Sequence, residues 1–187
     1  MFDTQEFVAS CRATLTESVP QLAIKELMLR TVERPAEVEA ALGTPAVGGI
    51  EPLHHSPELT VLNIIWTPGM SLSPHDHRMW VVIGLYGGQE DNRFYRRTPQ
   101  GLAAVGGKEL RIEDAVVLGE DVIHAVSNPG RTFTGAIHVY GGDFFAAKRS
   151  EWDPVTLEER PWDIANTRRV FTDANERYAA ERADRPS

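Results

Sequence analysis

The sequence predicts a mainly β barrel or sandwich, with short helices before it and a helical tail after it. From Gly48 onward, short runs rich in Val and Ile alternate with Gly, Pro, Asn and Asp. Many evenly spaced short strands of this kind are typical of barrels and sandwiches. We expect one domain, with N-terminal helices over 1–45, a β-barrel over 46–147 and a C-terminal extension over 148–187.

Three helices are expected before the barrel. The first covers 3–18, where residues at helical spacing form one apolar stripe: Phe7, Val8, Cys11 and Leu15. We interpret Cys11 as a small core residue of this stripe. The second helix covers 21–32, and a third begins at Pro35 and ends at Gly43.

The strands of the barrel are expected in seven apolar runs. These are 59–66, 79–86, 92–97, 109–112, 115–118, 122–126 and 132–140. Gly87-Gly88 and Asn128-Pro129-Gly130 are turn signals between neighbouring strands. After the barrel, residues 163–182 combine spaced apolar residues with many charges, which indicates a helix.

The overall composition limits the possible partners and compartments. The 187 residues are 42% hydrophobic and carry a net charge of −8, which suits one globular core and argues against a nucleic-acid partner. The chain has one cysteine, so it forms no intrachain disulfide. We find no apolar run of the roughly 20 residues that span a membrane, and no signal peptide. A cytoplasmic protein without membrane contact is expected.

A histidine motif is the strongest functional signal in the chain. His75 and His77 are separated by one residue, so on a strand they face the same side, while Asp76 faces away. His124 stands on a later strand that follows a Gly-led turn. Three imidazoles from two strands would hold a divalent metal ion and leave coordination positions open for catalysis.

These segments resemble the two metal-binding motifs of the cupin superfamily, whose fold is a double-stranded β-helix barrel. The first runs from Pro68 to His77, and the second from Leu118 to Asn128 with His124 inside it. Cupins usually supply a Glu a few residues after the second histidine, but residues 78–82 contain no carboxylate. The site is therefore expected to use three histidines alone.

A three-histidine cupin resembles the cysteine dioxygenase and thiol dioxygenase group, in particular its bacterial branch. Trp66 lies ahead of His75 where that group often has an aromatic residue, and the strand and turn from Trp80 to Gly88 are similarly placed. Residues 138–140, His-Val-Tyr, stand about where the group carries a Ser-x-His-x-Tyr relay. The resemblance covers roughly residues 60–145.

The resemblance implies a mononuclear non-heme iron dioxygenase that oxidises a small thiol to a sulfinate with O2. Fe(II) is inferred from the group, since imidazole ligands also suit Zn, Ni or Mn. Two alternatives remain open: another metal-dependent cupin enzyme, such as a carbon-oxidising dioxygenase or an isomerase, and a small-molecule-binding cupin. A homodimer is possible, although no feature of the sequence fixes the oligomeric state.

The resemblance also implies catalytic roles for His138 and Tyr140, with the histidine holding the tyrosine hydroxyl toward oxygen or substrate. The serine of the relay is Ala136 here, so the relay is shorter. The cysteine that crosslinks to the tyrosine in mammalian-type members is missing, and we predict no thioether. A buried core pair is the alternative interpretation of these two residues.

The substrate anchor has no direct counterpart, because residues 48–55 lack the Arg and Tyr that the group uses there. We consider Arg93, Tyr95 and Arg97, which share one face of a strand and suit a carboxylate. The alternative interpretation is that these three side chains form a solvent-exposed face of the strand and bind no substrate. His55 and Trp80 are further candidates for the wall of the substrate pocket.

Overall fold

The computed structural model describes residues 1–184 and contains two antiparallel sheets that face each other. The first sheet has the spatial order β1 (Gly49–His55), β2 (Thr60–Trp66), β9 (Thr134–Tyr140), β4 (Val81–Gly87) and β7 (Ala115–Leu118). The second has the order β11 (Glu159–Pro161), β10 (Ser150–Trp152), β3 (Ser71–Asp76), β8 (Ile123–Ser127), β5 (Gln89–Thr98) and β6 (Gly101–Arg111). Strands from both halves of the chain are neighbours in each sheet: β9 lies between β2 and β4 in the first, and β8 lies between β3 and β5 in the second. This is the cupin double-stranded β-helix that the sequence predicted.

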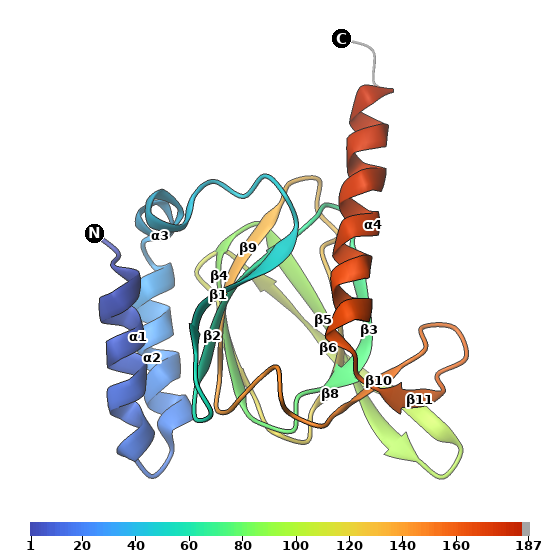
Figure 1. Ribbon diagram of the computed structural model, residues 1–187, viewed down its shortest axis with the longest axis horizontal. Helices are drawn as coiled ribbons and strands as arrows, with labels where there is room; N and C mark the ends of the chain where they lie inside the picture. The colour runs from blue at the N-terminus through green and yellow to red at the C-terminus, as the bar shows by residue number, and fades with distance from the viewer. Residues whose placement is uncertain (185–187) are drawn as a thin grey trace.

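Three N-terminal helices cover the outer face of the first sheet (Figure 1). They are α1 (Thr4–Ala13), α2 (Pro20–Val32) and α3 (Pro35–Leu42), with the short 3-10 helix η1 (Thr14–Thr16) after α1. Helix α2 comes so close to β4 that a Cβ on Gly84 would lie 2.3 Å from Cγ of Met28. The absent side chain at Gly84 therefore allows the helical layer to reach the sheet.

Helix α4 (Ile164–Ala183) follows the strands and lies on the other side of the barrel. It begins at Asp163, whose side chain accepts a hydrogen bond from the Ala165 amide at 2.8 Å. Phe171 and Ala174 bury the first half of the helix against the barrel, and its last turns run beyond the strands (Figure 1). No helix within residues 1–184 is long and apolar enough to cross a membrane.

Most of the predicted elements are present, with differences at their ends. All seven predicted runs contain a strand, and the helix expected over 163–182 is α4. The first helix is shorter than expected, because the α-helical part ends at Ala13 and one 3-10 turn follows. The C-terminal extension also contributes to the barrel, since β10 pairs with β3 in the second sheet. Residues 185–187 of that extension lie outside the described part of the chain.

Strand β9 divides the interior into two cores. Every residue of β9 is buried. Ile137 and Val139 face the helices, where they join a cluster that includes Cys11 and Met28. Tyr140 faces the space between the two sheets and belongs to a different cluster. The alternation of side chains along β9 therefore brings His138 and Tyr140 into the centre of the barrel.

Candidate metal centre

His75, His77 and His124 converge at the centre of the barrel, as the sequence predicted. His75 and His124 are opposite each other in the pairing of β3 with β8. His77 follows the end of β3, just before Arg78, whose φ of 55° turns the chain away. One ring nitrogen from each histidine lies within 4.8 Å of the others, and all three side chains are buried. Two strands and one turn therefore build a single cluster of nitrogen donors.

Two of the three imidazoles are oriented by carbonyl oxygens behind them. Nδ1 of His75 lies 2.9 Å from the Ser73 carbonyl oxygen, and Nδ1 of His124 lies 2.6 Å from Oδ1 of Asn92. A carbonyl oxygen only accepts hydrogen bonds, so each Nδ1 carries the proton and donates it. The Nε2 lone pairs of both rings are thus left free to face a metal ion.

Burial keeps all three imidazoles neutral at neutral pH. It lowers the pKa of His75 to about 4, with the Arg149 guanidinium acting in the same direction. Burial also lowers the pKa values of His77 and His124 well below the usual value, and the neighbouring histidines add to the effect. Neutral imidazoles are the form that binds a metal ion, because protonation would remove the lone pair.

The spacing of the nitrogens fits a metal ion. Nε2 of His77 lies 2.9 Å from Nε2 of His124. Two nitrogens that each bind an ion at about 2.1 Å, at right angles to each other, would be separated by about 3.0 Å. Within residues 1–184 the cluster contains no carboxylate. The three residues thus suit a divalent ion held by imidazoles alone.

Asp76 supports the cluster from behind. Its side chain is 1% exposed and faces away from the histidines, as expected from alternation along the strand. Its Oδ2 lies 2.9 Å from Nε of Arg78 and 3.2 Å from Nη2 of Arg97, while Oδ1 accepts from the Ser150 amide at 2.8 Å. These contacts tie the segment that carries His75 and His77 to β10.

The histidines line a small closed pocket of about 20 Å³, which holds roughly one water molecule or one ion. Apolar side chains form most of the remaining wall, among them Ile64, Trp66, Val126, Phe144 and Trp162. A wider hollow of about 690 Å³ lies beside it, and Arg149 and Trp162 line both spaces. These two side chains therefore separate the histidine pocket from the outer hollow.

His138 and Tyr140 lie in the same pocket as the three histidines. Nδ1 of His138 is 3.1 Å from the Tyr140 hydroxyl oxygen, and the Tyr140 ring centroid lies 5.0 Å from that of His77. Burial raises the pKa of Tyr140, so the phenol keeps its proton. The structure thus brings together the two residues for which the sequence predicted catalytic roles.

Three of the predicted substrate residues are outside this pocket. Arg93, Tyr95 and Arg97 share the outward face of β5, and the residues that face inward are Glu90 and Asn92. Arg97 is 40% exposed and binds the buried Asp76 and the exposed Glu159. None of the three lines the histidine pocket, and their position agrees with the alternative of a solvated face. Their role as a substrate anchor stays a prediction.

The other two predicted pocket residues are also elsewhere. His55 is 44% exposed and pairs with Asp143, its Nε2 lying 2.8 Å from Oδ1. Trp80 packs over Gly141, where an added Cβ would lie 2.0 Å from its ring, and belongs to the core beneath the helices. Neither side chain lines the histidine pocket.

Arg149 is the main residue of the pocket that the sequence did not reveal. Its guanidinium is 6% exposed and lies between the rings of Phe144 and Trp162, at 4.2 and 3.6 Å from their centroids. Nη1 lies 3.2 Å from Nδ1 of His77, and Nε has no hydrogen-bond partner among the described residues. No local pattern around Arg149 marks it as part of a site.

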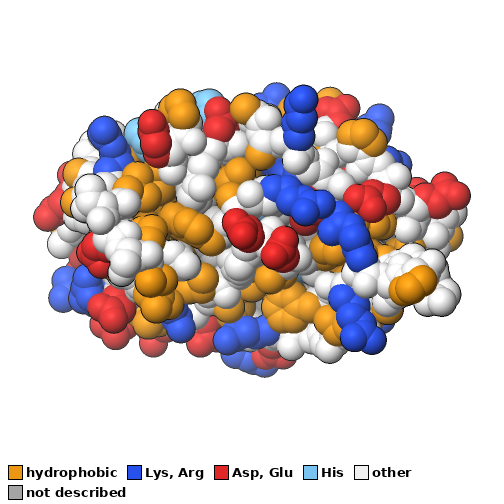
Figure 2. Space-filling view, turned by 90° about the horizontal axis from the view of Figure 1, so that it is seen from below, with side chains coloured by type: hydrophobic (Ala, Val, Ile, Leu, Met, Phe, Trp, Pro, Cys, Tyr) orange, Lys and Arg blue, Asp and Glu red, His pale blue; other side chains and the backbone are white. Residues whose placement is uncertain are grey.

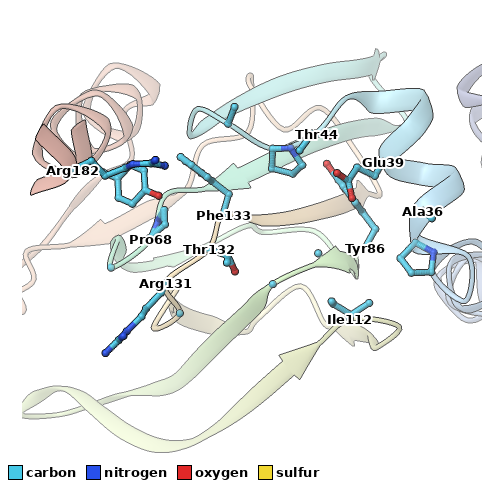
Figure 3. A pocket seen from close by; sticks show the side chains of 18 of the residues that line it. Ala36, Glu39, Thr44, Pro68, Tyr86, Ile112, Arg131, Thr132, Phe133 and Arg182 are labelled. Carbon is cyan, nitrogen blue, oxygen red and sulfur yellow. The ribbon is translucent and has the colours of Figure 1, made fainter. Parts of the chain in front are cut away.

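A larger hollow of about 1270 Å³ lies apart from the histidines, between α3, the turn before β9 and α4. Figure 3 shows Glu39, Thr132, Phe133 and Arg182 around it. Its lining contains no histidine. Elsewhere on the surface, Figure 2 shows basic, acidic and apolar side chains interspersed on one face of the molecule. Neither feature gathers groups that would hold a metal ion.

Comparisons with known proteins found cupin structures at low identity, and no family model matches the chain. An RmlC-like cupin from Methanocaldococcus jannaschii is 12% identical, with a TM-score of 0.46 over 54% of this chain and 86% of that one. A cupin superfamily protein from Desulfitobacterium hafniense is 15% identical, with a TM-score of 0.42 over 54% and 83%. A variant of oxalate decarboxylase from Bacillus subtilis is 13% identical, with a TM-score of 0.40 over 47% and 22%.

The order and pairing of the strands define the fold. Two facing antiparallel sheets hold three buried histidines between them. The chain has the cupin double-stranded β-helix fold, with a cluster at its centre that is suited to a metal ion.

Proposed function

We propose that this protein is a mononuclear non-heme iron dioxygenase that oxidises a small thiol to a sulfinate. The observation that carries the proposal is the arrangement of three neutral histidines around one point, with the Tyr140 hydroxyl in the same closed pocket. Three nitrogen ligands leave positions open for a substrate and for dioxygen. In the reaction RSH + O2 → RSO2H, both oxygen atoms end on sulfur, so no further reductant is required.

When bound, iron supplies the redox chemistry, and the protein supplies position, charge and the exclusion of water. Trp66, Phe144 and Trp162 give the pocket apolar walls, which limit the access of water to a reactive site. The Tyr140 phenol keeps its proton and lies in the same pocket, so its hydroxyl oxygen is available to accept a hydrogen bond from a substrate group. This supports a direct role of Tyr140 in the reaction.

Arg149 is the residue that we propose for contact with an anionic group of the substrate. An arginine only donates, so Nδ1 of His77 accepts from it in this structure. A neutral His77 that binds a metal ion through Nε2 carries its proton on Nδ1 and no longer accepts. Nη1 and Nη2 also donate to the carbonyl oxygens of Asp76 and Phe144, whereas Nε has no partner among the described residues. Nε, together with the Nη1 hydrogen released by His77, would then be available to a carboxylate.

Access to the pocket is proposed to pass between Arg149 and Trp162. The histidine pocket has room for little more than an ion, so a thiol needs additional space. The neighbouring hollow of about 690 Å³ is large enough for a small molecule. Its lining combines the cations Arg78, Lys148, Arg149 and Arg160 with the carboxylates Glu159 and Asp163, and this excess of cations favours a substrate that carries negative charge.

A second candidate is a cupin enzyme that uses Zn, Ni or Mn for another reaction. The same three imidazoles favour it, because they suit all of these ions. Metal analysis of the purified protein, followed by activity with each ion, separates the two candidates.

The experiment for the main proposal measures oxygen uptake by the Fe(II)-loaded protein with a panel of thiols, with and without a carboxylate, and identifies the product by mass spectrometry. We expect one sulfinate per O2 consumed for at least one thiol that bears an anionic group. The matched control is His124→Ala, which should show no uptake above free iron. If no thiol gives a sulfinate although iron is bound, the proposed reaction is wrong.

A further inference from the structure

Glu90 is a fully buried carboxylate that contacts both sheets of the barrel. It lies on β5, and its side chain is 0% exposed. Its Oε2 accepts from Nε1 of Trp66 at 2.8 Å and lies 3.5 Å from Nε2 of His138, while its Oε1 accepts from Nδ2 of Asn92 at 2.9 Å. A charge without water around it persists only when such donors compensate it. Two histidines of the candidate site are connected to Glu90: His138 lies beside its carboxylate, and His124 contacts Asn92, which donates to it.

The first series of contacts runs from Glu90 through His138 to Tyr140. Nε2 of His138 makes no hydrogen bond to the described residues, and the charged group beside it is the Glu90 carboxylate, whose Oε2 lies 3.5 Å away. Since a carboxylate only accepts, the compatible tautomer of His138 has its proton on Nε2. Nδ1 then holds a lone pair and accepts from the Tyr140 hydroxyl, at 3.1 Å. Glu90 thereby sets the direction of the hydrogen bond between His138 and Tyr140.

The second series of contacts runs from Glu90 through Asn92 to His124. Because Nδ2 of Asn92 donates to Glu90, its Oδ1 is directed to Nδ1 of His124, at 2.6 Å. That oxygen requires a proton on Nδ1, which leaves Nε2 of His124 free for a metal ion. The orientation of the Asn92 amide is therefore the link between Glu90 and a candidate ligand.

We propose that Glu90 is a positioning residue that fixes the tautomers of two histidines, His138 directly and His124 through Asn92. One carboxylate thus controls both the hydrogen-bond direction of Tyr140 and the free lone pair of His124. The proposal rests on the proposed function only where it takes His124 as a metal ligand. It also gives a role to a carboxylate in the interior of the barrel.

The first test reads the tautomers directly in the metal-free protein. Long-range 1H–15N correlation spectra of 15N-histidine-labelled protein distinguish a protonated Nδ1 from a protonated Nε2. We expect His124 with its proton on Nδ1 and His138 with its proton on Nε2, assigned by comparison with His124→Ala and His138→Ala. A wild-type protein with the proton of His138 on Nδ1 would overturn the proposal.

The second test changes the acceptor without changing its shape. In Glu90→Gln, the glutamine oxygen can still accept from Trp66, but its NH2 group now faces Asn92. The Asn92 amide should turn over, so that its NH2 group faces His124 and displaces the proton of that ring to Nε2. Affinity for Co(II), followed by its visible absorption, should fall about 10- to 100-fold, as for the loss of other groups that orient a ligand.

A rescue variant separates this effect from general damage to the core. Adding Asn92→Asp to Glu90→Gln moves the carboxylate by two residues and gives an acceptor to both the glutamine NH2 and the His124 Nδ1 proton. Affinity for Co(II) should return to within about threefold of wild type, well inside the loss expected for a disrupted ligand orientation. Glu109→Gln, an exposed change on neighbouring β6, is the control and should leave the affinity unchanged.

The possible outcomes decide between the two proposals. Wild-type affinity in Glu90→Gln, or no recovery in the double variant, would overturn the role of Glu90. If Glu90→Gln does not fold, the tautomers of the wild-type protein decide the question without it. If the wild-type protein binds no Co(II) at all, the proposed function fails, while the tautomer spectra still test Glu90.

Discussion

The histidine pocket and the hollow between α3 and α4 differ in size and in chemical content. The hollow is the larger by far, at about 1270 Å³ against about 20 Å³. Its charged residues, such as Glu39, Arg131 and Arg182, come from separate elements and surround an open space. In the pocket, by contrast, buried nitrogens converge within 4.8 Å. Convergence of oriented donors, and not volume, therefore identifies the candidate site.

The contrast has an electrostatic cause. Around the hollow, water screens the exposed charges. In the pocket, burial removes water and lowers the pKa values of the histidines. Substitutions in the pocket should therefore have large and specific effects, whereas matched substitutions around the hollow should have small ones.

The largest effect is expected for His124→Ala. Loss of one of three ligands should reduce affinity for Co(II) or Fe(II) by at least about 100-fold, more than the loss of a supporting group. His54→Ala is the control, since His54 does not line the pocket. Equal metal content in the two purified variants would contradict the assignment of the ligands.

The next effect is expected for Tyr140→Phe. The variant keeps the ring that packs against His77 and Phe144 but loses the hydroxyl that bonds to His138. Metal content should be retained, and kcat should fall about 100-fold, the usual scale for a group that assists proton transfer. A rate equal to that of the wild-type protein would return Tyr140 to a packing role.

Arg149→Met tests the contact with substrate charge. Methionine preserves much of the packing against Phe144 and Trp162, but the hydrogen bonds from Arg149 to the carbonyl oxygens of Asp76 and Phe144 are lost. We expect kcat/KM for an anionic thiol to fall about 10- to 100-fold, the scale of a hydrogen bond to a charged group. A neutral thiol should be affected less. Arg131→Met, beside the large hollow, is the matched control and should leave both substrates unchanged.

The pH dependence of the metal-free protein follows from His75. Its pKa is about 4 in the folded protein, below its value of about 6.5 in the unfolded chain. Below pH 6.5 the unfolded chain therefore binds a proton that the folded protein does not, and stability is lost as pH falls toward 4. At pH 5 this loss is about 2 kcal/mol from His75 alone. Urea unfolding at pH 7 and pH 5 measures it, and His75→Gln should show a smaller loss.

The smallest effect is expected for Arg93→Ala. The side chain lies on the exposed face of β5, and its described contact is the ring of Tyr95. Stability should change by less than about 0.5 kcal/mol, and kcat/KM by less than about twofold. A loss of activity with anionic thiols as large as that of Arg149→Met would restore Arg93 as the substrate anchor.

The sequence contained enough to predict the fold and the metal ligands because both depend on local periodicity. Alternation along strands placed His75 on one side and Asp76 on the other, and paired His138 with Tyr140. The same rule put Arg93, Tyr95 and Arg97 together on one face of β5. It did not reveal which face was inside, because polar residues occupy both faces of this strand.

Two features could only be decided by the tertiary structure. Arg149 gains its role from Phe144 and Trp162, which surround it, and from His77, which lies far away in the sequence. Glu90 gains its role from contacts with other strands, above all with His138. A charged residue reads as a surface residue in sequence, because only the folded protein shows whether donors compensate its burial.

The sequence by itself thus determined the β-barrel with its flanking helices and the histidines at its centre. The tertiary structure decided which charges surround those histidines and how they are oriented. The physical reason is that hydrophobic alternation is a local signal, with a period fixed by the strand. The partners of buried charges, in contrast, come from segments that only the packing of the two sheets brings together.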